Sequence, residues 1–207
     1  MTERLFDIDS YLNEFDCRVI SFGEDKNLIY IETDKTAFFP EGGGQTSDRG
    51  YLDTLYISDV QEKDGRIFHY TENTAEALQL LSNKTELHGK IDMEKRFSDM
   101  QQHSGEHIVS GIVCSSFGYN NVGFHLGTEI VTLDFDGALT REDIDRVELL
   151  ANKAIWDNKE ILVHYPSKDE LKSIEYRSKI EIEGQTRLVE IPGVDMCACC
   201  APHVKMT

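Results

Sequence analysis

The 207-residue chain lacks an apolar run long enough to cross a membrane as a helix, which takes about 20 consecutive apolar residues. Its first residues also lack the basic start and apolar stretch of a secretory signal. We therefore expect a cytoplasmic protein with no membrane partner. Because cytoplasmic thiols stay reduced, the five cysteines are interpreted as metal ligands or core residues before disulfides.

Positive charge is also scarce. The chain has 21 Lys and Arg against 38 Asp and Glu, which gives a formal net charge of −17. Residues 1–89 contain 8 basic and 18 acidic side chains, and residues 90–207 contain 13 and 20. Both halves would on average repel a phosphate backbone. Any contact with RNA is therefore expected to be local, or to be aided by another segment.

The spacing of apolar residues changes near residue 90, where we predict a boundary between two domains. Residues 1–90 hold short segments rich in β-branched and aromatic residues, separated by turn signals, which suggests a small N-terminal β-barrel. Residues 91–207 mix helical and alternating patterns and predict an α/β domain, so the fold class is α+β. We expect strands over 17–22, 27–33, 36–39, 55–60, 66–70, 85–92, 131–136, 161–165 and 187–191. We expect helices over 93–117 and 141–156, and a short one opened by the capping box of Ser167 and Glu170.

The helix predicted over 93–117 contains the stretch HSGEH. His103 and His107 are four residues apart, so their side chains project from one helix face about one turn apart. This spacing lets one helix offer two nitrogen ligands to one metal ion. The face continues an apolar stripe and should be buried, where unpaired imidazoles would be costly. A chance pair of histidines remains the alternative.

Three of the five cysteines lie in DMCACCAPHV, close to the C-terminal end. Cys199 and His203 have the spacing Cys-x-x-x-His, and with the two helical histidines they would complete a tetrahedral set suited to Zn²⁺. Cys200 is the near rival of Cys199 as the sulfur ligand. Buried small thiols are the alternative to a metal site.

The stretch TAFFPEGGGQTSDRG (36–50) is rich in glycine. It could be a flexible loop between strands, with glycines supplying positive φ. It could also let a substrate approach the bare backbone at Gly42, Gly43 and Gly44, with Gln45 offering donors and an acceptor. The pattern Gly-Lys-Ser/Thr of a phosphate-binding loop does not follow.

HSGEH also fits His-x-x-Glu-His, the motif of a class of zinc proteases in which the Glu is the general base. Glu181, Glu183 or Glu190 could then supply the third ligand. This rival explains neither the Cys/His segment nor the glycine-rich stretch. A zinc-stapled module that binds a partner without catalysis is a further alternative.

FFPEGGGQ (38–45), Arg96 with HSGEH, and Asp195 with CCAPH (199–203) together resemble the editing domain of alanyl-tRNA synthetase and its free-standing AlaX-type relatives. The order and rough spacing of these motifs run through nearly the whole chain. The resemblance implies a small N-terminal β-barrel joined to an α/β editing domain that holds zinc. It implies a deacylase that hydrolyses mischarged alanine tRNA, chiefly seryl-tRNA and in some members glycyl-tRNA. It carries the zinc ligands over to His103, His107, Cys199 and His203.

The chain departs from the family pattern in three respects. Glu106 stands where the family has Thr, so we expect it either to accept a proton from the attacking water or to hold the substrate's ammonium group; a surface glutamate is the alternative. His125, in VGFHLG, is the candidate replacement for a missing glutamine that would contact substrate. The chain ends soon after His203, so we expect a truncated piece whose grip on tRNA is helped by a missing C-terminal segment.

Overall fold

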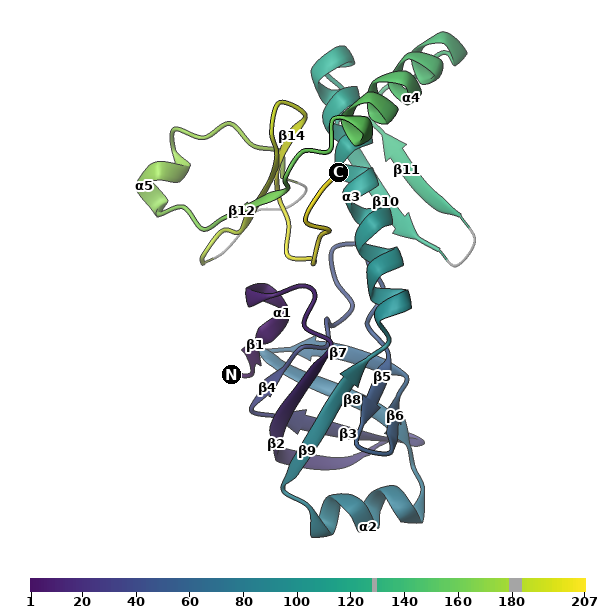
Figure 1. Cartoon of the computed structure of the whole chain (residues 1–207), viewed down its shortest axis with the longest axis vertical. Coiled ribbons are helices and arrows are strands. Elements are labelled where there is room, and N and C mark those ends of the chain that lie inside the picture. The colour runs from purple at the N-terminus through teal and green to yellow at the C-terminus, as the bar shows by residue number, and fades with distance from the viewer. Residues whose placement is uncertain (128–129, 179–183) are drawn as a thin grey trace. The chain divides into compact units, whose positions relative to one another are not determined.

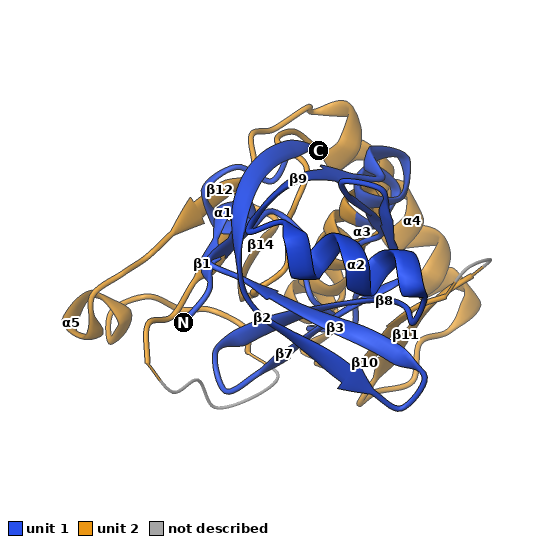
Figure 2. Ribbon diagram, turned by 90° about the horizontal axis from the view of Figure 1, so that it is seen from below, with its two compact units in different colours: residues 1–99 blue, residues 100–207 orange. Residues whose placement is uncertain are grey.

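The computed structural model describes residues 1–127, 130–178 and 184–207, which form two compact units, residues 1–99 and 100–207 (Figure 2). The mixed α+β class is confirmed. The units adjoin within helix α3 (Met93–Phe117), nine residues after the boundary near residue 90 that the sequence suggests. No helix in the described part of the chain is both long and apolar enough to span a membrane.

The first unit is built on a seven-stranded sheet in the order β6-β5-β9-β2-β3-β8-β7, in which every pair of neighbours is antiparallel. The remaining elements are a two-stranded pair, β1 with β4, and two helices. In chain order the elements are β1 (Glu3–Arg4), α1 (Leu5–Ile8), β2 (Glu14–Asp25), β3 (Leu28–Thr33), β4 (Lys35–Thr36), β5 (Gly50–Leu52), β6 (Leu55–Ile57), β7 (Asp59–Lys63), β8 (Arg66–Glu72), α2 (Ala75–Asn83) and β9 (Glu86–Ile91).

The predicted β-barrel is not closed by hydrogen bonds. Strand β2 pairs with β9 through its first half and with β3 through its second half, with a register shift between Val19 and Ser21. The two edge strands, β6 and β7, are separated by Ser58 alone, whose N–H donates to the carbonyl of Tyr70 in β8 at 2.9 Å. One residue is too short a link for the two strands to pair as a hairpin. Within residues 1–99, all of them described, the sheet is therefore open.

The second unit holds most of α3 and two small sheets. Its elements after α3 are β10 (Asn121–Leu126), β11 (Val131–Phe135), α4 (Arg141–Trp156), β12 (Leu162–His164), α5 (Lys168–Leu171), β13 (Leu188–Ile191) and β14 (Asp195–Ala198). The hairpin β10-β11 and the antiparallel sheet β12-β13-β14 flank the later part of α3 (Figure 1).

Helices α3, α4 and α5 lie where the sequence signals predict. The capping boxes at Thr140 and Ser167 are both formed, and α3 ends before Gly118, which adopts φ +74°. Six elements were not foreseen from the sequence, namely β1, α1, β5, α2, β10 and β14. The strand expected over 36–39 is wrong beyond Thr36, because the following backbone hydrogen-bonds to side chains instead of a strand, as at Phe38 and Phe39.

A fully buried histidine, His69, links β3 and β8 to the start of the glycine-rich stretch. Its Nδ1 lies 3.0 Å from the carbonyl oxygen of Ile31, which can only accept, so Nδ1 carries the proton. Its Nε2 then accepts from the Thr36 hydroxyl at 2.8 Å. Burial lowers the pKa of His69 to about 4. The folded unit therefore holds this ring in its neutral form.

We expect this histidine to make stability depend on pH. Its pKa in the unfolded chain is about 6.5, so between pH 6.5 and 4 the unfolded state binds more protons than the folded state. The His69 contribution is complete above pH 6.5 and is lost as the pH falls toward 4, a loss of roughly 3 kcal/mol. Denaturant unfolding at several pH values checks this. His69→Gln should flatten the slope in that window, and an unchanged slope would contradict the assignment.

Candidate metal centre

Helix α3 presents His103 and His107 on one face. Both side chains are buried, and their ring centroids are 5.5 Å apart, as the four-residue spacing predicts. The glycine between them, Gly105, does not break the helix. Two imidazoles are thereby held one helical turn apart on a rigid element.

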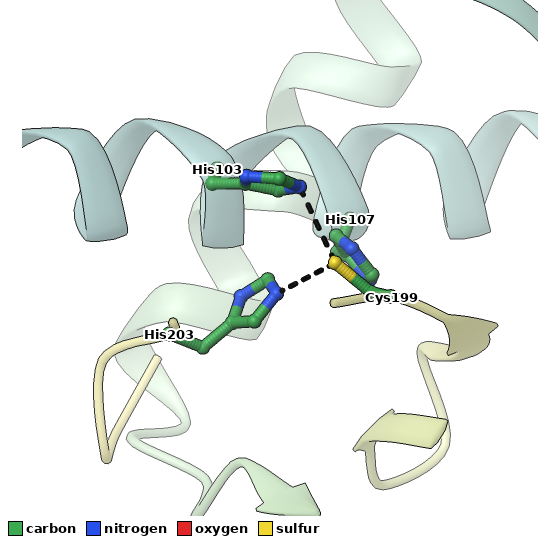
Figure 3. Close-up of side chains that lie close together, drawn as sticks. All are labelled: His103, His107, Cys199 and His203. Atoms are coloured by element: carbon green, nitrogen blue, oxygen red, sulfur yellow. Dashed lines mark hydrogen bonds between the residues drawn. The ribbon is translucent and has the colours of Figure 1, made fainter. Parts of the chain in front are cut away.

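The segment after β14 brings a thiol and a third imidazole to the same place. The Sγ atom of Cys199 lies 3.5 Å from His103 Nε2 and 3.4 Å from His203 Nε2 (Figure 3). One ligand atom from each of His103, His107, Cys199 and His203 lies within 4.8 Å of the others. The structure thus gathers the four residues that the sequence singles out, and Cys199 rather than the exposed Cys200 is in the group.

Backbone contacts shape the loop that carries Cys199. Arg187 in the approach to β13 donates to the carbonyl oxygens of Cys199 at 2.8 Å and Ala201 at 2.9 Å. The N–H of Cys199 donates to the Arg187 carbonyl at 3.2 Å, and the N–H of Ala201 donates to Cys199 Sγ at 3.4 Å. These bonds fix the turn that returns the chain to His203.

In His107 and His203, the Nδ1 atom has a hydrogen-bond partner, and Nε2 faces the other ligand atoms. His107 Nδ1 lies 3.0 Å from Asp195 Oδ2, and His203 Nδ1 lies 3.0 Å from Ser104 Oγ. A carboxylate that accepts from Nδ1–H selects the tautomer with a lone pair on Nε2. The histidines are therefore oriented as metal ligands usually are, with a hydrogen bond behind the ring.

The ionisation of the group suits a cation. Burial alone would raise the pKa of the Cys199 thiol, but His103 and His203 lower it well below its ordinary value. Burial lowers the pKa of His203 to about 3, which leaves a neutral ring. For His107, burial is outweighed by the hydrogen bond to Asp195 and by Cys199, which raise its pKa to about 10. A metal ion at Nε2 would replace that proton.

Formal charges point to a divalent ion. The Cys199 thiolate, Glu106 and Asp195 supply three negative charges around the group, and Arg177, paired with Asp195, supplies one positive charge. Once a metal ion has replaced the proton of His107, the buried side chains around it carry two net negative charges. A set of three nitrogens and one sulfur matches Zn²⁺ in both ligand type and number. The residues present fit a zinc ion.

Glu106 is buried, so the alternative of a surface glutamate is wrong. Its Oε1 accepts from the Ser110 hydroxyl at 2.7 Å and from Asn121 Nδ2 at 2.8 Å. Its Oε2 lies 3.7 Å from His107 Nε2. Asn121 Nδ2 also donates to Ser110 Oγ at 2.9 Å, while Asn121 Oδ1 has no hydrogen-bond partner in the described part of the chain. The amide is thus oriented by the carboxylate and the hydroxyl.

Strand β10 places a side chain against the histidines that the sequence did not indicate. The ring of Phe124 lies 4.9 Å from that of His103, between centroids. His125, the next residue in the strand, is exposed, and alternation along a strand turns it to the opposite face. The proposal that His125 contacts substrate gains no support from this geometry and stays a prediction.

The glycine-rich stretch forms an ordered turn in the first unit. Gly42 and Gln45 exchange backbone hydrogen bonds of 3.1 and 3.0 Å around Gly43 (φ 61°) and Gly44 (φ 84°). Positive φ at both central residues is the geometry of a type I′ hairpin turn, for which glycine is favoured. The stretch is thus a loop whose glycines supply positive φ, as the sequence suggests, and Gln45 is fully buried beside the turn.

A buried ion pair holds the base of this turn. Arg96 is fully buried, pairs with Asp48 and donates to the carbonyl oxygen of Ala37 at 2.6 Å. Asp48 Oδ2 accepts from the N–H of Phe39 at 2.6 Å. The family motif Arg96 thus lies with the glycine-rich motif inside the first unit.

Several site residues were missed by sequence reasoning, namely Ser104, Ser110, Asn121, Phe124, Arg177 and Arg187. They come from four separate segments and share no spacing. Ser104 and Ser110 lie on the helix turns beside the histidines, which is the one signal that could have found them.

Of the three carboxylates that could serve a zinc protease, the structure describes Glu190 alone, and Glu190 is not in the group. Glu190 hydrogen-bonds His164 Nε2 at 2.7 Å. It pairs across the sheet with Met196, so it lies on the face opposite Asp195 and Cys197. Glu181 and Glu183 lie outside the described residues. The fourth partner of the histidines is instead a thiol.

Comparison with known proteins relates the whole chain to a named group of proteins. No family model matches the chain. It is 32% identical over 231 aligned residues to the alanyl-tRNA editing protein AlaX-M of Methanosarcina mazei, covering 100% of this chain and 87% of the relative. It is 30% identical to AlaX-L of Pyrococcus horikoshii and to Aarsd1 of Mus musculus, over 100% and 95% of this chain but 52% and 50% of those relatives.

The chain therefore belongs to the alanyl-tRNA editing proteins, as its motifs predict. It spans about half the length of AlaX-L and Aarsd1, and most of the length of AlaX-M.

Gly111, one turn beyond His107, allows α3 to approach the start of β14. A Cβ at this position would lie 2.4 Å from the carbonyl oxygen of Val194 and 2.7 Å from Asp195 Cβ. Gly111→Ala should therefore destabilise the protein by roughly 1–3 kcal/mol and weaken metal binding. Gly105→Ala is the matched control, since a Cβ there meets nothing within 4 Å among described atoms. It should be neutral or stabilising by up to about 1 kcal/mol. Equal melting temperatures for the two variants would contradict this packing.

Proposed function

We propose that the protein is a zinc-dependent deacylase that hydrolyses alanine tRNA carrying a wrong amino acid, either serine or glycine. The observation that carries the proposal is the buried group of His103, His107, Cys199 and His203 in a member of the alanyl-tRNA editing proteins. The reaction is attack of water on the ester that joins the amino acid to the terminal ribose.

His103, His107, Cys199 and His203 would hold the zinc ion. Four protein ligands fill a tetrahedral shell, which is the usual arrangement of a structural site. We therefore infer that bound zinc supplies a fixed positive charge that orients the substrate's amino or hydroxyl group.

Glu106 is the chain's own candidate for proton transfer. Ser110 and Asn121 both donate to Oε1, so the second oxygen is directed by two hydrogen bonds toward the histidines. From there the carboxylate would either accept a proton from the attacking water or hold the ammonium group of the substrate. The geometry is compatible with both roles.

The glycine-rich turn is the proposed substrate contact of the first unit. Gly43 and Gly44 expose backbone that a substrate can approach closely, and Gly42 is half-buried. The amide of Gln45 stays a prediction, because its side chain is fully buried beside the turn. His125 is retained as a weaker candidate in the second unit. The acidic composition implies that tRNA is held through local contacts rather than through the overall charge of the chain.

A non-catalytic zinc module is the second candidate, because a closed set of four ligands leaves no open position on the metal. Full zinc content without any hydrolysis of seryl- or glycyl-tRNA for alanine would favour it over the deacylase.

The ligand set can be tested by elemental analysis. Purified protein should contain about one zinc per chain, and Cys199→Ala should lose most of it, because a single thiolate is part of the group. Cys200→Ala is the matched control and should keep its zinc. If both variants keep full zinc, Cys199 is not a ligand, and a wild-type protein that is folded and active without metal would rule out the zinc site.

The role of Glu106 can be tested with Glu106→Gln, which removes the charge and keeps an oxygen for Ser110 and Asn121. Deacylation of seryl- or glycyl-tRNA should fall by about 100-fold or more, the usual effect of losing a general base, with zinc content unchanged. Glu142→Gln, on the exposed surface of α4, is the control. Activity within about threefold of the wild type would make Glu106 a bystander.

A further inference from the structure

Arg177 reaches the metal-ligand group through a buried carboxylate. Its Nε donates to Asp195 Oδ1 at 2.7 Å and its terminal nitrogen donates to Asp195 Oδ2 at 2.8 Å. The same Oδ2 lies 3.0 Å from His107 Nδ1. The side chains of Asp195 and His107 are each 2% exposed, and that of Arg177 is 15% exposed. A continuous chain of hydrogen bonds thus runs from Arg177 to a proposed zinc ligand.

The backbone of Arg177 is held independently of its side chain. Its N–H donates to the Met196 carbonyl at 2.8 Å, and its carbonyl accepts from the N–H of Ala198 at 2.9 Å. These bonds form a parallel bridge opposite Cys197, on the free edge of β14. Substituting the side chain therefore leaves the docking of this segment intact.

The planar fork of the guanidinium fixes the orientation of the Asp195 carboxylate, which a single hydrogen bond from His107 could not do. A fixed carboxylate accepts from Nδ1–H and so holds the His107 ring in one tautomer and one orientation. The Nε2 lone pair then faces Cys199 and the other two histidines. Neither Arg177 nor its link to the group has a sequence signal, because 18 residues separate it from Asp195.

We propose that Arg177 is a positioning residue of the metal site, which acts through Asp195 to set the tautomer and orientation of His107. The inference rests on the proposed function insofar as the four-residue group binds zinc. In this role Arg177 strengthens metal binding, although its positive charge by itself would weaken it.

The sign of that effect separates positioning from electrostatics. A cation close to the site repels a divalent metal, so removal of the Arg177 charge should by electrostatics alone tighten metal binding. Loss of positioning should weaken it, and the loss of such outer partners typically costs 10- to 100-fold in metal affinity. The two explanations therefore predict shifts of the dissociation constant in opposite directions.

The test measures the dissociation constants of Zn²⁺, by competition with a chelating dye, and of Co²⁺, by the visible spectrum of the bound ion. The full 207-residue chain is compared with its Arg177→Gln, Arg177→Lys, Asp195→Asn and Arg177→Gln/Asp195→Asn variants. Arg141→Gln is the matched control, because it removes an arginine charge from an exposed pair with Asp145 in the same unit.

We expect Arg177→Gln to weaken metal binding at least 10-fold and to alter the Co²⁺ spectrum, while Arg141→Gln changes neither. Arg177→Lys keeps the charge without the fork and should recover part of the affinity at most. In the Asp195→Asn background, Arg177→Gln should cause no further weakening, because the arginine acts through the carboxylate. Circular dichroism shows whether each variant is folded. If Arg177→Gln does not fold, the comparison is made with Arg177→Lys.

Unchanged or tighter binding in Arg177→Gln would overturn the inference, as would equal weakening with and without Asp195. Failure of the wild-type chain to bind either metal would instead remove the proposed zinc site, and with it any positioning role for Arg177.

Discussion

The hydrogen bond between His107 and Asp195 is the contact on which the site depends most. It joins helix α3, which supplies two imidazoles, to strand β14, which leads directly into the Cys199 loop. A helix and a strand 88 residues apart in the chain are thereby held in one arrangement. The bond costs the carboxylate its hydration, and the Arg177 fork compensates for that loss.

The close approach of these two elements has a steric condition. Gly111 lies on the face of α3 that meets residues 194–195, where any Cβ would collide with backbone. Gly111 lowers the helix propensity of α3, but it allows the helix to lie closer to β14 than any other residue would. Gly105, in the same helix, has no comparable neighbour, so the two glycines of this segment serve different purposes.

Two networks of buried polar residues meet at His107. Asp195 and Arg177 support the ring of His107, while Ser110 and Asn121 direct Glu106. The second network leaves the Asn121 carbonyl oxygen without a donor in the described part of the chain, a cost that typically amounts to about 1–3 kcal/mol. This cost is what we expect if the position of the Glu106 carboxylate matters more for function than local stability does.

The local features of this protein follow from its sequence alone. The four-residue spacing of His103 and His107 determined that both would share a helix face, and capping boxes determined where α4 and α5 begin. The motifs also identified the family. These predictions are correct because they depend on the helical repeat, on short-range hydrogen bonds, or on the order of motifs along the chain.

Which groups support the site and which lie apart from it could be read only from the folded chain. Cys199 rather than Cys200 lies with the histidines, and Glu106 is buried beside them. Arg177 pairs with Asp195, and His125 faces away from the side occupied by Phe124. The first sheet is open where a barrel was expected. Each of these outcomes depends on strand pairing or packing between segments far apart in the chain, and no local spacing encodes such contacts.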